Sequence, residues 1–315
     1  MVIGSGNDMP GWLAIDASRQ GEVRLSIAAP SRVPQLGPVF ACRTDEMPTF
    51  TDALMRLERE VGVSFEGLEP ALAIAGAVSA NTVTIARSRW TISHGGLDAL
   101  FRRRTTIINE VAARAWAMRG GRAPVEHLRG TIAIDPRRPG RHAMIMVQEG
   151  VGGAMTDVDA DGAARIIESE VGHTDFAAQT AQEEALAGAI RATLHGAPLT
   201  WEHMLMIDRG DAVMATALPG MSDVERQQLL GRMLGRFTVN VMLSSAAWNG
   251  VVLTGSRIGR LLSAAGRAGF AQAFEERRAY RRMILATPCQ IVQQADPVLT
   301  GLAEMLAERQ GHRPG

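Results

Sequence analysis

The chain has 315 residues, of which 46% are hydrophobic and 21% charged, and its formal net charge at pH 7 is zero. This composition is ordinary for a soluble globular protein, and the length predicts about two domains. All 33 basic residues are arginine, which excludes chemistry that depends on lysine, such as a Schiff base. Aromatic residues make up only 4% and the arginines are scattered or in short runs, so nucleic-acid binding is not expected.

The two cysteines, Cys42 and Cys289, lie far apart and outside any metal-binding or redox spacing. We expect both to be buried, small hydrophobic side chains in a reducing compartment. Residues 1–11 lack the basic start and apolar core of a signal peptide, and no apolar run approaches the roughly 18 residues that cross a membrane. The sequence therefore predicts a cytoplasmic location without a membrane segment.

Strand and helix signals alternate along the first part of the chain. Apolar runs next to turn residues indicate strands, and apolar residues at helical spacing indicate amphipathic helices. In chain order, the predicted elements are strands at 12–16, 23–28 and 39–43, a helix at 49–61, strands at 71–75 and 83–85, a helical turn at 98–103, a strand at 106–108 and a helix at 111–119.

The rest of the chain continues with strands and then becomes mostly helical. A glycine-rich turn is predicted at 150–154 because a strand runs directly into it. The other predicted elements are strands at 130–134, 143–147 and 155–158, helices at 183–194, 200–206 and 223–243, a strand at 250–253 and a last helix at 297–309. The alternation predicts an α/β fold.

Polar side chains gather where predicted strands end. Asn109 and Glu110 follow strand 106–108, and open α/β sheets place ligands at such carboxyl ends. Glu170 and His173 form a second acidic and imidazole cluster, behind a glycine. Sugar hydroxyls both donate and accept hydrogen bonds, and carboxylates with mixed donor and acceptor groups match them. A polyol, most naturally a sugar, is the predicted ligand.

These segments, in this order, resemble the bacterial glucokinases of the sugar kinase/actin-like superfamily over nearly the whole chain. The collinear motifs are residues 71–78 with Trp90, 108–110, 170–176 and 201–202, followed by 234–237, Gly255, 270–276, 291–292 and 296–297. The resemblance implies an α/β, two-domain actin-like (RNase H-like) sugar kinase fold with an interdomain cleft. It also implies a smaller domain of residues 1–108 plus 297–315, a larger domain of residues 109–296, and a homodimer.

The resemblance further implies a hexose site. Its sugar-binding residues would be Asn109, Glu110, Glu170, His173 and Glu202. Three of them also have a structural alternative: Asn109 would cap the following helix, His173 would satisfy a loop backbone and Glu202 would be first-turn helix charge.

Glu110 would be the catalytic base that takes the proton from the sugar's primary hydroxyl. The family has aspartate at this position, and the extra methylene of glutamate shifts its reach by roughly one to one and a half ångström, enough to slow transfer about a hundredfold. The sequence therefore predicts a carboxylate base of reduced efficiency.

The first phosphate-binding hairpin departs from the family. The family carries Asp-Ile-Gly-Gly-Thr there, and its glycines let backbone N–H groups approach the phosphates. Asp16 is kept and is expected to position Mg²⁺, but residues 17–20 are Ala-Ser-Arg-Gln. Arg19 is a candidate to meet phosphate with its own charge, and the alternative is an exposed hairpin arginine.

The second phosphate turn is also altered. Gly150 and Gly152 match two glycines of the family's Gly-Thr-Gly-Leu-Gly, while a valine replaces the hydroxyl residue. Gly255 matches the adenine wall, but residues 206–210 replace the family's Ser-Gly-Pro-Gly. ATP and Mg²⁺ are the cofactors that the resemblance implies, with a weakened phosphate side.

Two functions follow from this asymmetry. The first is ATP-dependent phosphorylation of glucose or a related hexose at the 6-hydroxyl, slow because the phosphate loops are altered. The alternative is a sugar-binding pseudokinase that acts as a sensor or regulator. The shape of the site around residues 79–91 would decide which hexose binds.

Overall fold

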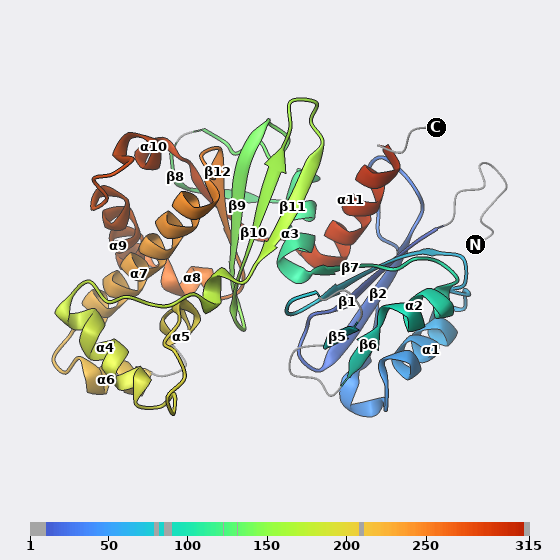
Figure 1. The fold of residues 1–315 in the computed structure, drawn as a ribbon, viewed down its shortest axis with the longest axis horizontal. Coiled ribbons are helices and arrows are strands. Elements are labelled where there is room, and N and C mark those ends of the chain that lie inside the picture. The colour runs from blue at the N-terminus through green and yellow to red at the C-terminus, as the bar shows by residue number, and fades with distance from the viewer. Residues whose placement is uncertain are drawn as a thin grey trace. The chain divides into compact units, whose positions relative to one another are not determined.

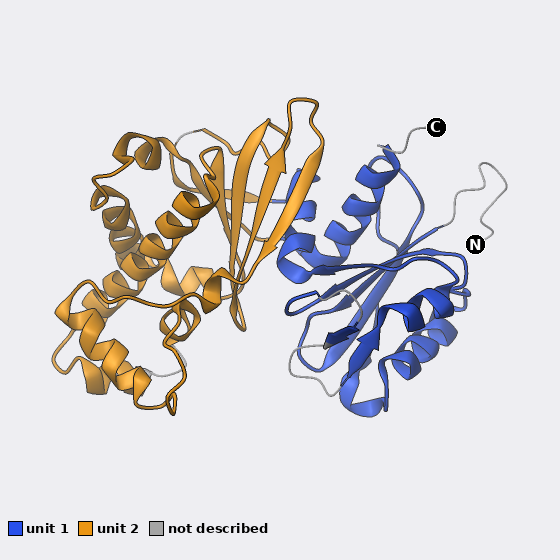
Figure 2. Cartoon of the chain, viewed as in Figure 1, with its two compact units in different colours: residues 1–123, 294–315 blue, residues 124–293 orange. Residues whose placement is uncertain are grey.

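The computed structural model describes residues 11–78, 82–84, 90–121, 123–130, 132–207 and 211–311 (Figure 1). The chain forms two compact units, which we call unit 1 (residues 1–123 and 294–315) and unit 2 (residues 124–293) (Figure 2). Each unit has its own sheet and its own apolar core. The domain boundary at residues 108 and 109 inferred from the sequence stays a prediction.

Unit 1 is built on a five-stranded sheet of order β3-β2-β1-β4-β7. Its elements are β1 (Trp12–Ala17), β2 (Glu22–Ala28), β3 (Phe40–Arg43), η1 (Thr44–Glu46), α1 (Phe50–Val61), β4 (Glu69–Ile74), β5 (Thr82–Thr84), β6 (Thr91–Ser93), α2 (His94–Phe101), β7 (Thr106–Asn109), α3 (Glu110–Arg119) and α11 (Pro297–Gly311). Strand β4 runs parallel to both β1 and β7, so the carboxyl ends of these three strands share one edge of the sheet. Asp16 and Asn109 lie at that edge.

Local sequence signals explain several of these elements. Helix α1 begins with a capping box, in which Thr49 and Asp52 bond each other's backbone N–H groups, and it ends at Gly62 in the left-handed conformation. Strand β1 is buried along its whole length, as expected for the centre of the sheet. Helix α11 packs closely on α3, since a side chain on Gly301 would lie 1.7 Å from the carbonyl oxygen of Ala113.

Unit 2 is built on a six-stranded sheet of order β11-β10-β9-β12-β13-β8. Its elements are β8 (Val125–Arg129), β9 (Gly140–Val147), β10 (Val151–Val158), β11 (Ala164–Ser169), η2 (Val171–His173), α4 (Ala181–Arg191), α5 (Trp201–Leu205), α6 (Asp211–Ala217), α7 (Asp223–Ser245), β12 (Gly250–Thr254), α8 (Ile258–Leu261), α9 (Ala264–Glu275), α10 (Arg281–Ala286) and β13 (Cys289–Val292). Helices α7 and α9 lie side by side (Figure 1). Glycines permit this, because a side chain on Gly231 would lie 1.9 Å from the Gly266 carbonyl oxygen.

The predicted elements are largely confirmed, with two errors. The described residues of the range 130–134 form no strand. The strand of this region is β8, which ends at Arg129, just before the predicted range. It lies at the edge of the sheet beside β13, and an edge strand needs little apolar pattern. The turn after β9 is residues 148–150, and Gly152 lies inside β10 rather than in a turn. Glycine is needed in that strand because a side chain on Gly153 would lie 2.6 Å from Val171.

Some predictions concern parts of the chain outside the described residues. Residues 79–81 and 85–89, which belong to the segment expected to select the hexose, are among them, as are residues 208–210. Within the described ranges, no helix combines the length and apolar character needed to cross a membrane.

Candidate functional site

Asn109 ends β7 and caps helix α3. The residue is 7% exposed, the amide oxygen accepts a hydrogen bond from the Val111 N–H at 2.7 Å, and the amide nitrogen donates to the Gly76 carbonyl at 3.1 Å. The helix-capping role is therefore present in the structure. The sugar contact of Asn109 stays a prediction.

Glu110 is the first residue of α3, and an arginine one turn along the helix faces its carboxylate. The Arg114 Nη2 atom lies 3.9 Å from Glu110 Oε2, and both side chains are largely buried. Burial lowers the pKa of the Arg114 guanidinium, and the charge of Arg19 acts in the same direction, whereas Glu110 and Asp16 oppose the shift. These charged groups of unit 1 therefore act on one another.

Asp16 and Arg19, both predicted for the phosphate side, do lie together. The Asp16 side chain is 1% exposed, and its Oδ1 atom accepts hydrogen bonds from the Ser18 N–H at 3.0 Å and the Ser18 hydroxyl at 2.6 Å. Arg19 Nε lies 3.7 Å from Asp16 Oδ2, and Arg19 Nη2 lies 3.7 Å from Asp296 Oδ1. Asp296 also pairs with Arg24. The carboxylates of Asp16 and Asp296 therefore already interact with serine and arginine groups of the chain itself.

Mg²⁺ and ATP, which the family resemblance implies, fit these residues poorly. Magnesium prefers carboxylate oxygens that are open to the ion and its waters, whereas Asp16 is buried with Ser18 on one oxygen and Arg19 near the other. A phosphate nest needs outward backbone N–H groups, and the Ser18 N–H points back to Asp16.

In unit 2, the structure brings Glu170 and His173 together around the short helix η2. His173 Nε2 lies 3.9 Å from Glu170 Oε2, and the two side chains are 59% and 45% exposed, respectively. Gly172 fixes this segment against β10, because a side chain there would lie 2.0 Å from the Val151 carbonyl oxygen. Both polar side chains are therefore presented to solvent on a segment whose backbone is closely packed.

Glu202, on the first turn of α5, is joined to the turn between β9 and β10. Its Oε2 atom accepts a hydrogen bond from the Val151 N–H at 2.8 Å. A side chain on Gly150 would lie 2.8 Å from the same oxygen, so glycine leaves room for the carboxylate. The family resemblance assigns this turn to phosphate, but here a carboxylate of the chain takes one of its N–H donors.

The remaining predicted glycines have structural roles. Gly152 pairs with Met146 in the ladder between β9 and β10. Gly255 has a φ of 107°, and a side chain there would lie 2.3 Å from the Val147 carbonyl oxygen. Whether either glycine contacts a nucleotide stays a prediction.

Three charged residues at these places were not predicted from the sequence. Arg114 follows Glu110 at the i,i+4 spacing of a helix, so the pattern would have indicated it. Asp296 and Arg24 carry no such local signal, because their pairing joins residues at the two ends of unit 1.

Comparison with solved structures identifies the fold. Glucokinase from an Antarctic psychrotroph matches with a TM-score of 0.71 at 17% identity, covering 95% of this chain and 99% of that chain. Glucokinase from Balamuthia mandrillaris in complex with glucose matches with a TM-score of 0.72 at 14% identity, covering 95% and 93%. A ROK hexokinase from Thermus thermophilus gives a TM-score of 0.59 at 14% identity, covering 96% and 100%. The chain therefore has the two-domain, actin-like α/β fold of these sugar kinases.

Sequence comparison then specifies the family. The sequence model of the glucokinase family matches residues 21–206 and 201–309, and the chain belongs to the glucokinase family. Glucokinase of Stenotrophomonas maltophilia (strain R551-3) is 26% identical over 299 residues, covering 86% of this chain and 87% of that protein. Glucokinase of Xylella fastidiosa (strain 9a5c) is 23% identical over 286 residues, covering 82% and 83%.

Proposed function

We propose that this chain binds glucose or a related hexose and slowly transfers a phosphoryl group to its 6-hydroxyl. The proposed sugar-binding residues are Asn109, Glu110, Glu170, His173 and Glu202. The observation that carries the proposal is the Glu110 carboxylate on the first turn of α3, at the carboxyl edge of the unit 1 sheet, in a chain of the glucokinase family.

Glu110 is proposed as the general base. Its carboxylate takes the proton of the 6-hydroxyl while the sugar oxygen attacks the terminal phosphorus of the donor, and the bond from that phosphorus to the donor's bridging oxygen breaks. Arg114, 3.9 Å from Oε2, orients the carboxylate. ATP is the donor proposed from the family. The poor fit of Asp16 to Mg²⁺ and the occupied turn donors support a slow reaction.

A sugar-binding pseudokinase is the second candidate, and one observation favours it. At both turns that the family uses for phosphate, a backbone N–H donates to a carboxylate of the chain: Ser18 to Asp16, and Val151 to Glu202. A protein that binds a hexose without transferring phosphate does not need these two N–H groups for phosphate, so their bonds to carboxylates would not impair its function.

Mass spectrometry of hexose phosphate separates the two candidates. Purified protein is incubated with glucose, ATP and Mg²⁺ beside Glu110→Ala and a control, Glu184→Ala, whose exposed carboxylate pairs with Arg191 on α4. Product from wild type and Glu184→Ala but not from Glu110→Ala supports the kinase. Glucose binding by calorimetry without product in any protein supports the pseudokinase. If the wild-type protein neither binds glucose nor forms product, the proposed function is overturned.

A further inference from the structure

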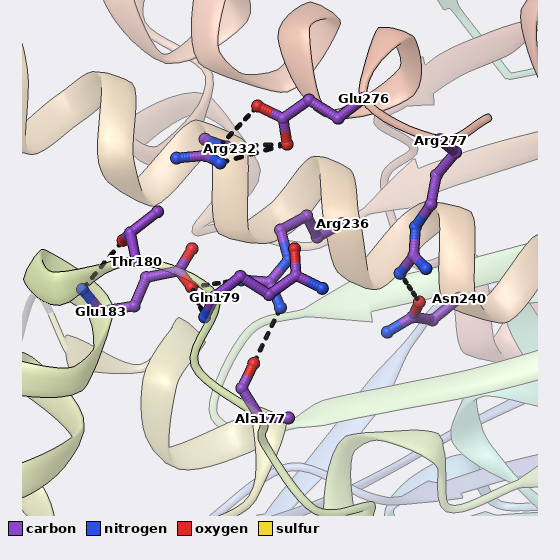
Figure 3. Close-up of polar contacts among 9 residues, drawn as sticks. All are labelled: Ala177, Gln179, Thr180, Glu183, Arg232, Arg236, Asn240, Glu276 and Arg277. Carbon is purple, nitrogen blue, oxygen red and sulfur yellow. Dashed lines mark hydrogen bonds and ion pairs between the residues drawn. The ribbon is translucent and has the colours of Figure 1, made fainter.

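A fully buried ion pair lies in unit 2, between two residues to which no role has been assigned above. Arg236 of α7 is 3% exposed and Glu183 of α4 is 0% exposed, and Arg236 Nη1 donates to Glu183 Oε2 at 2.5 Å (Figure 3). The same carboxylate oxygen accepts the Gln179 N–H at 2.6 Å. The pair therefore joins two helices and the segment that leads into α4.

This pair is poorly arranged for stability alone. Among the described residues, Arg236 Nε and Glu183 Oε1 are buried without a hydrogen-bond partner. Burying both charges is costly, and apolar pairs of similar size are often at least as stable. A buried pair with unsatisfied atoms suggests a requirement other than folding energy, and the contacts of the guanidinium indicate which one.

The Arg236 guanidinium contacts two aromatic rings and one backbone carbonyl. Its Nη2 atom donates to the Ala177 carbonyl at 2.8 Å (Figure 3). Its central carbon lies 5.7 Å from the ring centroid of Phe176 and 5.5 Å from that of Trp201. These two rings pack edge to face with centroids 4.8 Å apart. Arg236 therefore contacts two chain segments at once.

Those two segments carry the sugar-side residues of unit 2. They are paired through their backbones, since the Phe176 N–H donates to Leu199 at 2.9 Å and the Trp201 N–H donates to Thr174 at 3.0 Å. The first segment, residues 170–176, carries Glu170 and His173, and the second, residues 199–202, carries Glu202. A shift of Arg236 would move both.

We propose that Arg236, held by Glu183, is the positioning residue that sets Glu170, His173 and Glu202 for the hexose. Glu183 orients the guanidinium, and the guanidinium fixes the paired segments through Phe176, Ala177 and Trp201. This inference rests on the proposed hexose binding.

Three variants separate positioning from stability. Arg236→Met removes one charge and leaves Glu183 buried alone, so it should also lower the melting temperature. Arg236→Met combined with Glu183→Leu removes both charges and should restore the melting temperature. Arg232→Met is the matched control on the same helix, because Arg232 pairs with Glu276 at 3.0 Å rather than with Glu183 (Figure 3).

Two readouts decide the test. Calorimetry with glucose should show affinity about tenfold weaker or more in both Arg236 variants, the size of effect that misplaced polar groups produce, and unchanged affinity in Arg232→Met. Amide hydrogen exchange of residues 170–176 and 199–202 should be faster in both Arg236 variants only.

A double variant that regains stability while binding glucose weakly supports positioning. If the stable double variant binds glucose as tightly as the wild-type protein and exchanges the amide hydrogens of residues 170–176 and 199–202 at the wild-type rate, the positioning role is overturned. Hydrogen exchange needs no ligand, so it tests the positioning of the two segments even if the wild-type protein binds no glucose. Failure of the wild-type protein to bind glucose would overturn the proposed function but not the positioning.

Discussion

The polar groups of the two units are held in different ways. In unit 1, Asn109 is buried and caps α3, and the carboxylates of Glu110 and Asp16 face arginines within their own unit. In unit 2, Glu170 and His173 are about half exposed and separated by 3.9 Å. Their position depends on the backbone packing of Gly172 behind them.

This difference separates folding roles from ligand roles. A side chain that caps a helix or neutralises a buried charge contributes to stability, so its substitution changes the fold and the site together. A half-exposed side chain on a firmly packed segment contributes little to stability. Asn109, Glu110 and Asp16 of unit 1 should therefore show coupled effects, whereas the half-exposed Glu170 and His173 of unit 2 should show effects on binding alone. The packing behind these two side chains should matter most.

The largest effect is expected from Gly172→Ala. The added methyl group would lie 2.0 Å from the Val151 carbonyl oxygen, so segment 170–173 must move away from β10. We expect a loss of about 1–3 kcal/mol in the free energy of unfolding, together with weaker hexose binding. Urea unfolding and calorimetry measure both. Gly188→Ala, on α4 with nothing within 4 Å, is the control and should be neutral or stabilising. Unchanged stability of Gly172→Ala would show that the segment is not firmly packed.

Glu202→Ala should weaken hexose binding next most strongly. The substitution removes a hydroxyl acceptor and also releases the Val151 N–H, which Glu202 accepts at 2.8 Å. We expect about thirtyfold lower affinity, or about 2 kcal/mol, by calorimetry with glucose. Glu184→Ala, on the exposed face of α4, should bind as wild type does. Equal affinities in the two variants would remove Glu202 from the hexose site.

Asn109→Ala should lower both stability and binding in unit 1. The α3 N-cap is lost, and with it the bonds to Val111 and Gly76, at a cost of about 1 kcal/mol in the free energy of unfolding. The matched change in unit 2, Glu170→Ala, should alter stability by less than about 0.5 kcal/mol while weakening hexose binding. Equal losses of stability in the two variants would contradict the division drawn above.

The smallest effect concerns the cysteines, one in each unit. Burial raises the pKa of the Cys289 thiol from 9.0 to about 12, and burial is also the main cause of the raised pKa of Cys42. The native state therefore retains the Cys289 proton where the unfolded chain loses it. This contribution to the free energy of unfolding is complete well below pH 9 and declines as the pH rises through 9 toward 12. Raising the pH from 7 to 9 should therefore lower the free energy of unfolding by about 0.4 kcal/mol.

Alkylation provides the measurement for each cysteine. At pH 8, iodoacetamide should label Cys289 only in unfolded protein, and mass spectrometry after proteolysis distinguishes it from Cys42. Rapid labelling of native Cys289 would show that the core of unit 2 opens readily. Faster labelling of Cys42 than of Cys289 would identify unit 1 as the less stable of the two.

Much of the fold was predictable from local sequence. The strands of the unit 1 sheet and helices α1, α3 and α7 were expected within a few residues, because apolar periodicity and caps such as Thr49 and Ser222 specify them. Strand β8 was misplaced because an edge strand needs little apolar pattern. Gly152 was assigned to a turn because glycine marks both turns and closely packed strands.

The candidate site was predictable only in part. Collinear motifs identified the family, and the family membership is confirmed. The roles of Glu110, Glu170 and Glu202 stay predictions, but the structure adds partners that the motifs did not contain. Arg114 faces Glu110, and the Val151 N–H occupies Glu202.

The sequence by itself determined the strands of the unit 1 sheet, helices α1, α3 and α7, the absence of lysine chemistry and the family. Only the tertiary structure decided which charges meet, as in Arg24 with Asp296 and Arg236 with Glu183. It also decided that the backbone donors of two turns are already taken by carboxylates. The physical reason is that periodicity and caps act over a few neighbouring residues, whereas these pairings join segments that only the packing of each unit brings within hydrogen-bond distance.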